Sequence, residues 1–466
     1  MKRINADSNS DRMYVQKVSL ENIRSIKKLE MEFPNPAGWH VIIGDNGSGK
    51  STVVKTIAFC IVGPKQVAYL RQSPTNWINF QAQSGSIKVE IHLDKTYDDG
   101  IELIESNPIS SNIQLLRPQN TILNTPNGEH QFQGGVLAFS FNLGVKKGEN
   151  GHEKEFEEKF EEKWGQQGWF SLGFGPFRKL STSTNLPRTE NTAQNIDYSL
   201  AEAHLNLFDD NSNFQSLAWL IDLNYKRLIE IEKGNSNENG IIYKFLLKFI
   251  NESKLLPHGA QIEGIDKKGI IFKDGNGNYI PILDLSEGYR SILSLTFELI
   301  YQLVRVYGAQ AVFADIEKGK MEINLPGVVL IDEIDAHLHP SWQVDVGFWF
   351  TQYFPQLQFI VTTHSPLVCR AAEKGSIWRL AKPGTDSEAK EITGIEKDRL
   401  VYGNILDAYG TELFGKNTVR STQSNKKLER LGRLNMLYAL GKIKPTEEKE
   451  RLKLQKILST DDPTGF

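Results

Sequence analysis

The chain has 466 residues, of which 39% are hydrophobic and 24% are charged, and its formal net charge at pH 7 is −3. This length allows two or three domains, and the nearly balanced charge argues against a protein that binds polyanions over its whole surface. The two cysteines, Cys60 and Cys369, provide neither a disulfide framework nor a metal-binding spacing. The polar N-terminus has no signal-peptide core, and no apolar run reaches the roughly 18–20 residues of a membrane span. We therefore expect a cytoplasmic protein with no membrane partner.

The first part of the chain predicts strands followed by helices. Residues 13–43 predict two strands around a turn and then a buried strand that leads into a loop. Residues 50–62 are apolar at helical spacing, and residues 86–105 predict a hairpin that turns at Asp98–Gly100. Residues 153–164 predict a short amphipathic helix, whose charged face we expect to be solvated.

The middle of the chain changes composition. Residues 181–215 are rich in Ser, Thr and Asn and predict an exposed connection or mobile loop. Helical patterns then dominate from residue 214 to residue 256, and residues 268–283 predict a hairpin with its tip at Asp274–Gly277.

The segment after residue 400 is predicted to be helical and is basic, because residues 416–456 contain twelve Lys and Arg against four Glu. Leucine recurs at every third position in this segment, which predicts that one side is buried. The recurring residues are Leu428, Leu431, Leu434, Leu437 and Leu440. Three interpretations stay open: a packed surface for an oligomer or partner, a solvated helical face, or direct contact with nucleic acid.

The stretch GDNGSGKS, residues 44–51, carries the strongest signal because a predicted strand precedes it and a predicted helix follows it. Glycines in such a loop let backbone N–H groups converge on phosphate oxygens, and the helix N-terminus adds the positive end of its dipole. Lys50 is expected to reach the β- and γ-phosphates of ATP, and Ser51 to ligate Mg²⁺. The residues predicted to surround the nucleotide here are Asn46, Gly47, Ser48, Gly49, Lys50, Ser51 and Thr52.

Two further apolar runs end in residues suited to nucleotide hydrolysis. In VVLIDE, residues 328–333, Asp332 can hold the Mg²⁺ shell and Glu333 can act as the base that polarises water. In FIVTTHSP, residues 359–366, His364 by itself is a turn histidine, but its place about thirty residues after Asp332 favours a hydrogen bond to the γ-phosphate. Lys50, Glu333 and His364 are therefore the predicted catalytic residues.

The stretch LSEGYRS, residues 285–291, lies between the phosphate loop and VVLIDE. This order of motifs resembles the head of ATP-binding cassette ATPases, and specifically the branch shared by SMC, RecF and OLD-type ATPases. The resemblance implies that Ser286 and Gly288 begin a helix whose N-terminus caps the γ-phosphate held by another subunit. A head-to-tail dimer is then required to complete the site. Glu287 departs from the transporter version of this motif, and we expect it to turn towards Arg290.

The same resemblance implies roles for residues that carry little signal alone. Asp335, in DEIDAHLHP, matches the loop that crosses the dimer interface, and Arg24 aligns with an arginine near the nucleotide. His337 and His339 are spaced i, i+2 without a third ligand, which does not match a zinc site. The glutamine loop of the family has two candidates here, Gln66 and the stretch at residues 175–178.

The implied fold is α/β, an ABC-ATPase head with a mixed β-sheet and flanking helices, a helical insertion and a helical C-terminal tail. We predict an N-terminal lobe at residues 1–180, the insertion at 181–265, a C-terminal lobe at 266–400 and a basic helical segment at 401–466. The short distance between Ser51 and Ser286 and the absence of heptads distinguish the chain from long-coil repair and condensin ATPases.

Stretches such as LGFGPFRKL, at residues 172–180, are similar to a group of compact bacterial ATPases from Septu (PtuA) and retron-associated antiphage defence systems. That resemblance implies a separate HNH-type nuclease partner (PtuB-like), ATP and Mg²⁺ as cofactors, and an oligomer. The nine histidines form no HNH cluster and the segment after residue 380 lacks the paired acids of a Toprim domain, so we expect no nuclease site in this chain. The alternative function is that of a RecF-like repair ATPase that binds DNA directly, and contact with DNA or RNA stays open.

Overall fold

We describe a computed structural model of the whole chain, which divides into two compact units, Met1–Val401 and Tyr402–Phe466. The predicted domain boundaries at residues 180 and 265 lie inside the first unit and stay predictions. The structure describes residues 13–70, 72–93, 108–117, 122–125, 128–131, 136–142, 164, 170–179, 199–234, 238–256, 259–266, 269–385, 387–403 and 422–458.

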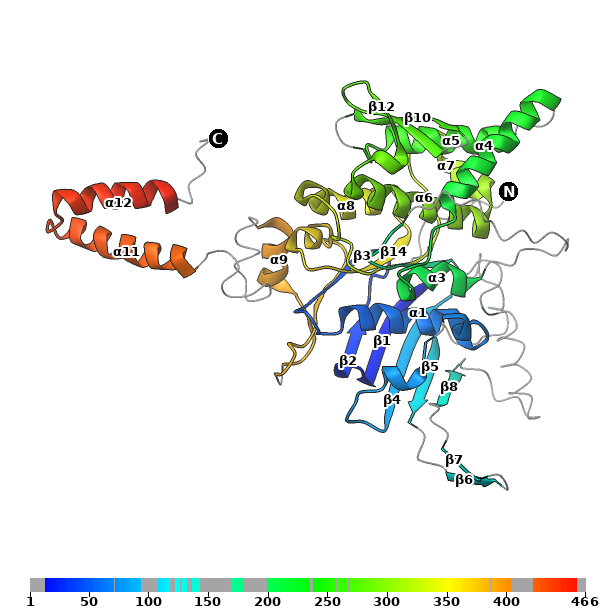
Figure 1. Cartoon of the computed structure of the whole chain (residues 1–466), viewed down its shortest axis with the longest axis horizontal. Helices are drawn as coiled ribbons and strands as arrows, with labels where there is room; N and C mark the ends of the chain where they lie inside the picture. The colour runs from blue at the N-terminus through cyan, green and yellow to red at the C-terminus, as the bar shows by residue number, and fades with distance from the viewer. Residues whose placement is uncertain are drawn as a thin grey trace. The chain divides into compact units, whose positions relative to one another are not determined.

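A six-stranded, mostly parallel sheet forms the centre of the first unit (Figure 1). Its strands in spatial order are β16 (Lys390–Glu391), β15 (Ile377–Arg379), β3 (Gly38–Ile43), β14 (Leu357–Thr362), β13 (Gly327–Ile331) and β9 (Ser171–Phe174). Only the β15–β16 pair is antiparallel. Every residue of β9, β13 and β14 is buried, which is typical of parallel strands covered on both faces.

A second, antiparallel sheet lies below it in the view of Figure 1. Its strands in spatial order are β2 (Ile26–Glu32), β1 (Tyr14–Ile23), β4 (Ser84–His92), β5 (Ile109–Leu116) and β8 (Val136–Asn142). The predicted hairpin within residues 86–105 is only partly right, because β4 pairs with β5, which begins at Ile109. The predicted turn at Asp98–Gly100 and residues 153–163 of the predicted amphipathic helix lie outside the described residues. A further pair is β6 (Ile122–Thr125) with β7 (Gly128–Gln131).

Helix α1 (Lys50–Gln66) packs between the two sheets. Its buried residues belong to one core that includes Ile87 of the antiparallel sheet and Ile360 of the parallel sheet. The helix breaks at Gly63, where φ is +74° and a Cβ would lie 2.6 Å from Nε1 of Trp164. Residues 50–70 are long and apolar enough to cross a membrane, but 61% of the most apolar window is buried inside the protein, as in a core helix. Two 3₁₀ helices follow, η1 (Val67–Leu70) and η2 (Pro74–Trp77).

The prediction of a loop throughout residues 181–215 is wrong, because helix α3 (Leu200–Phe208) forms within it. Ser199 caps this helix by accepting a hydrogen bond from the Glu202 backbone N–H, and Glu202 lies in the first turn. This Ser-x-x-Glu spacing is the signature of a capping box. The apolar face of α3, with Leu200 and Leu207, joins the core around α1.

The next segment forms a layer of helices and a small sheet. It contains α4 (Ser216–Lys233), α5 (Glu238–Glu252), β10 (Gln261–Asp266), β11 (Gly269–Lys273), β12 (Tyr279–Pro281), η5 (Ile282–Asp284), α6 (Glu287–Tyr307) and α7 (Ala309–Glu317). The predicted hairpin is confirmed, since β11 pairs with β12 around Asp274–Gly277. The unit continues with α8 (Pro340–Tyr353), η6 (Pro366–Ala371) and α9 (Gly394–Tyr402).

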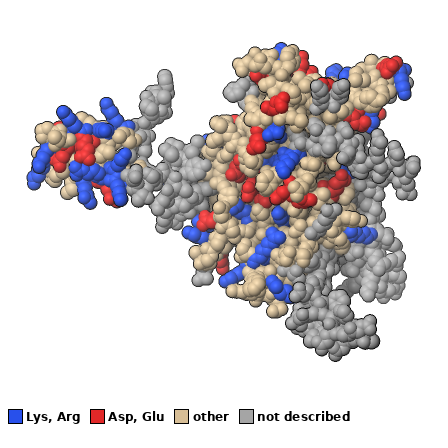
Figure 2. Space-filling model, viewed as in Figure 1, with Lys and Arg blue, Asp and Glu red and all other residues tan. Residues whose placement is uncertain are grey.

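The second unit contains a hairpin of two helices, α11 (Thr422–Ala439) and α12 (Pro445–Leu458). Leu431, Leu434 and Leu454 form its buried core. The expected buried side is confirmed for Leu431 and Leu434, whereas 3.6-residue periodicity carries Leu428 and Leu440 out of the seam, where they are 40% and 57% exposed. Lys and Arg cover much of this hairpin's surface in Figure 2.

These elements confirm the predicted α/β fold with flanking helices and a helical C-terminal segment.

Candidate functional site

Three motifs meet at one edge of the parallel sheet. Strand β14 pairs with β3 on one side and with β13 on the other, and all three run in the same direction. Their carboxyl ends therefore lie together, followed by the phosphate loop after Ile43, Asp332 after Ile331 and Thr363 after Thr362. The carboxyl edge of a parallel sheet is where α/β proteins bind ligands, so this edge is the candidate site.

The backbone of the phosphate loop includes left-handed conformations that favour glycine. Gly47 and Gly49 have φ angles of +79° and +99°, a region that side chains disfavour. A Cβ on Gly49 would lie 2.8 Å from the side chain of Ile26, the first residue of β2. The Lys50 ammonium donates to the carbonyl oxygens of Gly44 at 2.8 Å and Asp45 at 3.2 Å, which holds it across the loop.

One hydroxyl of the same loop, that of Ser48, is buried without a hydrogen-bond partner among the described residues. Burial lowers the pKa of Lys50, while the charges of Glu333, Asp332 and Asp335 oppose this shift. The ammonium and the carboxylates after β13 therefore lie close enough to interact, as one nucleotide and metal site requires.

Asp332 and Glu333 share the hydroxyl of Thr362. Thr362 Oγ1 donates to Asp332 Oδ1 at 2.6 Å and accepts the Glu333 backbone N–H at 2.8 Å. Asp332 is 3% exposed, while Glu333 is half-buried and has a φ of +48°. A positive φ at a residue other than glycine is strained and is found often at functional sites. The bond from Thr362 therefore fixes the Asp332 carboxylate, and the Glu333 side chain projects from a residue with a left-handed backbone conformation.

Asp335 and His364 are brought together by the ends of neighbouring strands. Asp335 Oδ1 accepts the hydroxyl of Thr363 at 2.6 Å and the backbone N–H of His364 at 3.3 Å. His364 itself is exposed. Asp335 therefore fixes the backbone from which the predicted γ-phosphate contact projects.

Arg24 lies beside the phosphate loop in the β1–β2 turn. Its guanidinium covers the ring of Trp77 at 3.7 Å from the centroid, and its backbone N–H donates to Trp77 O at 2.8 Å. Burial lowers the pKa of Arg24. The following residue, Ser25, has its hydroxyl 3.1 Å from where a Cβ on Gly49 would lie, so the turn and the loop are in contact.

The signature stretch lies at the start of α6. Ser286 is the N-cap residue, is exposed and makes no side-chain capping bond. A Cβ on Gly288 would lie 2.9 Å from His337 O, so this position has no room for a side chain. Within the described ranges no hydrogen bond or ion pair joins Ser286 or Gly288 to the phosphate loop of the same chain.

The Glu287 carboxylate lies near two side chains, one of which is the expected Arg290. One carboxylate oxygen lies 3.2 Å from His337 Nδ1 and the other 3.8 Å from the Arg290 guanidinium. His339 is the N-cap of α8 and accepts the Ser341 backbone N–H at 3.3 Å. The described part of the chain contains no group of three or more potential metal-binding side chains from His, Cys, Asp and Glu.

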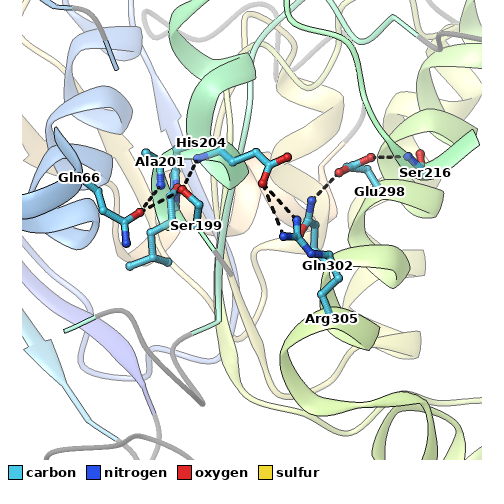
Figure 3. Close-up of polar contacts among 10 residues, drawn as sticks. Gln66, Ser199, Ala201, His204, Ser216, Glu298, Gln302 and Arg305 are labelled. Carbon is cyan, nitrogen blue, oxygen red and sulfur yellow. Dashed lines mark hydrogen bonds and ion pairs between the residues drawn. The ribbon is translucent and has the colours of Figure 1, made fainter. Parts of the chain in front are cut away.

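The two candidates for the glutamine loop have different surroundings. Gln66 Oε1 accepts from Ser199 Oγ at 3.1 Å and from the Ala201 N–H at 3.0 Å, so it joins α1 to the start of α3 (Figure 3). Arg178, in the other candidate stretch, donates through Nη2 to the carbonyl oxygens of Asp332 and Glu333, each at 2.8 Å. The 175–178 stretch therefore adjoins the predicted catalytic residues.

Figure 3 also shows how α3 and α6 are joined beyond Gln66. Arg305 of α6 lies 3.4 Å from the Glu202 carboxylate of α3, and Gln302 donates to the buried Glu298 at 2.7 Å. Glu298 in turn accepts the Ser216 backbone N–H at the start of α4, at 3.0 Å. Burial raises the pKa of Glu298. A chain of polar contacts thus runs from α1, the helix that follows the phosphate loop, to the start of α4.

Sequence reasoning did not assign Arg178 to the nucleotide site. Its guanidinium is 6% exposed, and burial lowers its pKa to about 10, against the charges of Asp332, Asp335 and Glu333. The available signal was its place four residues after the short strand β9, which pairs in parallel with β13. That pairing joins residues about 150 positions apart and has no local sequence pattern.

Comparison with known proteins agrees with this architecture. The family model described as "AAA domain" matches residues 17–254, and a second AAA-domain model matches residues 169–370. The Septu protein PtuA of Bacillus mycoides (strain KBAB4) is 24% identical over 373 residues, which is 78% of this chain and 40% of the relative. The "Retron Ec83 probable ATPase" of Escherichia coli is 23% identical over 413 residues, covering 82% of this chain and 74% of the relative.

Two more distant likenesses are local or structural. The DNA replication and repair protein RecF of Clostridium beijerinckii (strain ATCC 51743 / NCIMB 8052) is 30% identical over 105 residues, 22% of this chain and 28% of the relative. The Smc head domain derived from Pyrococcus furiosus, with an extended coiled coil and bound to the C-terminal domain of ScpA, aligns with a TM-score of 0.46 at 17% identity. That alignment covers 82% of this chain and 96% of the Smc chain.

This chain spans less than half of the Bacillus mycoides relative, so the activity of that whole protein is not transferred by likeness alone. The AAA-domain model, by contrast, covers more than half of the chain and includes the phosphate loop. The chain belongs to the AAA-domain family of P-loop ATPases.

Proposed function

We propose that the chain binds ATP with Mg²⁺ and hydrolyses it at the edge formed by β3, β14 and β13. The observation that carries this proposal is the meeting of the phosphate loop, Asp332–Glu333 and His364 at one sheet edge, with charge interactions between Lys50 and the carboxylates. Backbone N–H groups of the loop, the α1 N-terminus and Lys50 would bind the phosphates. The remaining contacts with nucleotide are assigned to Arg24, Asn46, Gly47, Ser48, Gly49 and Thr52.

The residues present fit a Mg²⁺ ion. Asp332 uses Oδ1 for the bond from Thr362, and within the described part of the chain no hydrogen bond reaches its second oxygen. Ser51 and Asp332 would hold the ion, which when bound neutralises charge on the β- and γ-phosphates. Glu333 would accept a proton from the attacking water, and His364 would hydrogen-bond the γ-phosphate.

We further propose that two chains pair head to tail on ATP. Ser286 is an uncapped helix start, and the first amide groups of a helix bind anions. Ser286 and Gly288 of one chain would then cap the γ-phosphate held by the other, with Asp335 at the same interface. Each site would be incomplete in a single chain.

At the level of the cell, we propose that the chain is the cytoplasmic ATPase subunit of an antiphage defence complex that regulates a separate HNH-type nuclease. Support comes from the names of relatives that match more than three quarters of this chain, a Septu protein and a retron ATPase. The state of the ATP site would set whether the partner is restrained or released.

The test combines the purified chain with infected cells. Phosphate release and molar mass are measured with ATP and with ADP, and plaque formation is measured with the neighbouring gene present. We expect turnover, an ATP-dependent increase in mass and protection that is lost in Lys50→Ala and Glu333→Gln. Protection that is unchanged in both variants contradicts an ATP-dependent defence role.

A second candidate is a repair ATPase that binds DNA directly. The local likeness to RecF and the basic α11–α12 hairpin favour it. Its test is the salt dependence of binding to gapped duplex DNA, because each neutralised phosphate adds to the slope. Binding that is lost when Lys426, Lys427 and Arg433 are changed to Glu supports this candidate, and no binding at low salt rules it out.

A further inference from the structure

The buried guanidinium of Arg178 joins two parts of the molecule that are distant in sequence. Its Nη2 group donates to the backbone oxygens of Asp332 and Glu333, each at 2.8 Å. Its Nη1 group donates to the hydroxyl of Ser291, in the second turn of α6, at 3.1 Å. One planar side chain therefore contacts both the turn with the predicted catalytic base and the helix whose N-terminus carries the signature stretch.

The backbone around Arg178 is fixed from other directions. The Arg178 carbonyl accepts the hydroxyl of Ser294, one turn further along α6, at 3.2 Å. Asn206 of α3 accepts the Gly175 N–H at 2.9 Å and donates to Phe177 O at 3.1 Å. A Cβ on Gly175 would overlap the Asn206 carbonyl, so this stretch lies directly on α3. The arginine is thus placed by the scaffold and has little freedom to follow a ligand.

Two of the bonds from Arg178 reach the turn that carries Glu333. Glu333 has a φ of +48°, and its carbonyl is one of the two that Arg178 holds. A strained backbone persists only when surrounding contacts fix it. Removing the guanidinium frees the turn at residues 332–335, and a displacement near 1 Å of a catalytic group is enough to reduce the rate by about 100-fold.

We propose that Arg178 is a positioning residue that sets the Glu333 backbone and couples this turn to α6 of the same chain. The inference rests on the proposed ATP hydrolysis and deepens it. Nucleotide bound against Asp332 and Glu333 would bias the placement of Ser286 and Gly288, which serve the site of the other chain. The two ATP sites of a pair would communicate through this bridge. Arg178 bonds to the backbone of Asp332 and Glu333 and to the Ser291 hydroxyl, so we expect it to act through the residues that it holds.

The test uses Arg178→Ala in the full chain. We expect the nucleotide Kd to stay within about threefold of wild type and kcat to fall by about 10- to 100-fold. A cavity of about 490 Å³ adjoins Arg178, Ser291 and His337 and gives a small cation access to the vacated place. Methylguanidinium should therefore restore at least about fivefold of the lost kcat, and it should not accelerate wild type. A purely structural role predicts loss of folding or of nucleotide binding, with no such rescue.

A second variant, Ser291→Ala, removes the contact of the Arg178 guanidinium to α6 and keeps its bonds to Asp332 and Glu333. With a non-hydrolysable ATP analogue, wild type should show slower backbone hydrogen exchange at residues 332–338 and at residues 287–291. In Ser291→Ala the slowing should remain at residues 332–338 and be lost at 287–291. Thr296→Val is the matched control, because Thr296 is buried in α6 and its hydroxyl bonds only to Ile292 O among the described residues.

The outcomes separate the bridge from hydrolysis itself. If wild type releases no phosphate, the proposed hydrolysis is wrong, and the exchange measurement still tests the bridge. If wild type hydrolyses ATP and Arg178→Ala keeps its kcat, only the bridge is wrong. Unchanged exchange protection in Ser291→Ala also overturns the coupling, including the case in which Arg178→Ala does not fold.

Discussion

The phosphate cradle and the signature face use the same helix-end chemistry but differ in completeness. In the cradle, residues 44–52 with Asp332 and Glu333, the Lys50 ammonium and the Asp332 carboxylate already have partners from the same chain. The signature face comprises Ser286, Glu287 and Gly288 at the start of α6. Ser286 is exposed and uncapped, and the Glu287 carboxylate lies near His337 and Arg290. One site is preorganised within the chain, whereas the other presents groups outward.

This difference suggests that nucleotide binding and turnover depend on one region, and association of two chains on the other. A preorganised cradle binds nucleotide with little reorganisation, so its variants should change binding or turnover directly. An outward face contributes only when a second molecule arrives, so its variants should act through association. The following predictions test whether the two regions can be separated in this way.

The largest expected effect comes from Lys50→Ala. This change removes the ammonium that crosses the phosphate loop, so nucleotide affinity should fall by about 100-fold, as for charged hydrogen bonds, and turnover by more. Fluorescent-nucleotide titration and phosphate release measure the two effects. Affinity within threefold of wild type would contradict the placement of the cradle.

Glu333→Gln should separate binding from chemistry inside the cradle. The amide keeps the size of the side chain but cannot accept the proton, so kcat should fall by about 100- to 1,000-fold while nucleotide Kd changes less than threefold. Single-turnover phosphate release checks this. Turnover at the wild-type rate would mean that another group polarises the water.

Ser286→Arg should break only the signature face. The bulky cation occupies the uncapped helix start, so ATP-dependent pairing should weaken by at least about 50-fold while nucleotide binding by the single chain is kept. Analytical ultracentrifugation with ATP measures the pairing. Gln310→Arg, at an exposed position of α7, is the control that adds the same charge elsewhere. Normal pairing in Ser286→Arg would show that the face lies outside the interface.

Histidines divide in the same way, and this predicts a pH dependence of stability. His40 on β3 and His204 on α3 are buried, and burial lowers the pKa of each from 6.5 to about 4. His337, beside the signature face, is exposed. The unfolded chain therefore binds more protons between pH 6.5 and 4, so stability present above pH 6.5 is lost as pH falls. Each buried histidine should cost about 2 kcal/mol at pH 5 relative to pH 7.5.

Urea unfolding at pH 7.5 and at pH 5 measures this dependence. His204→Gln should remove about half of the loss. An equal dependence in the wild type and the variant would assign acid sensitivity to other groups.

Glu287→Gln is expected to give the smallest effect. The change removes a negative charge one residue from the proposed phosphate contact, so pairing should become about threefold tighter as helix-end charge effects are modest. The ATP concentration at half-maximal assembly measures this. Glu317→Gln, at the exposed end of α7, is the control, and weaker pairing in Glu287→Gln would mean that the bond to His337 orders the face.

Local patterns predicted much of the fold. The β11–β12 hairpin, helices α4 and α5 and the strand–loop–helix at residue 44 each depend on neighbours a few positions apart. Helix α3 was missed because the segment before it is polar, although Ser199 caps the helix and Ser199 and Glu202 have the spacing of a capping box. The hairpin after β4 was predicted, but its second strand, Ile109–Leu116, lies beyond the predicted range of residues 86–105.

By itself, the sequence determined the chemistry available at the site: the glycines that allow a left-handed loop, the lysine and serine that follow them, and the acids that end a buried strand. Only the tertiary structure decided which acids interact with Lys50 and that the Glu287 carboxylate lies near His337. It also decided that Arg178 bonds to the backbone of Asp332 and Glu333. The reason is physical. Loop conformation follows from local sterics, whereas contacts between β9, β13 and α6 depend on parallel pairing and helix packing over more than a hundred residues.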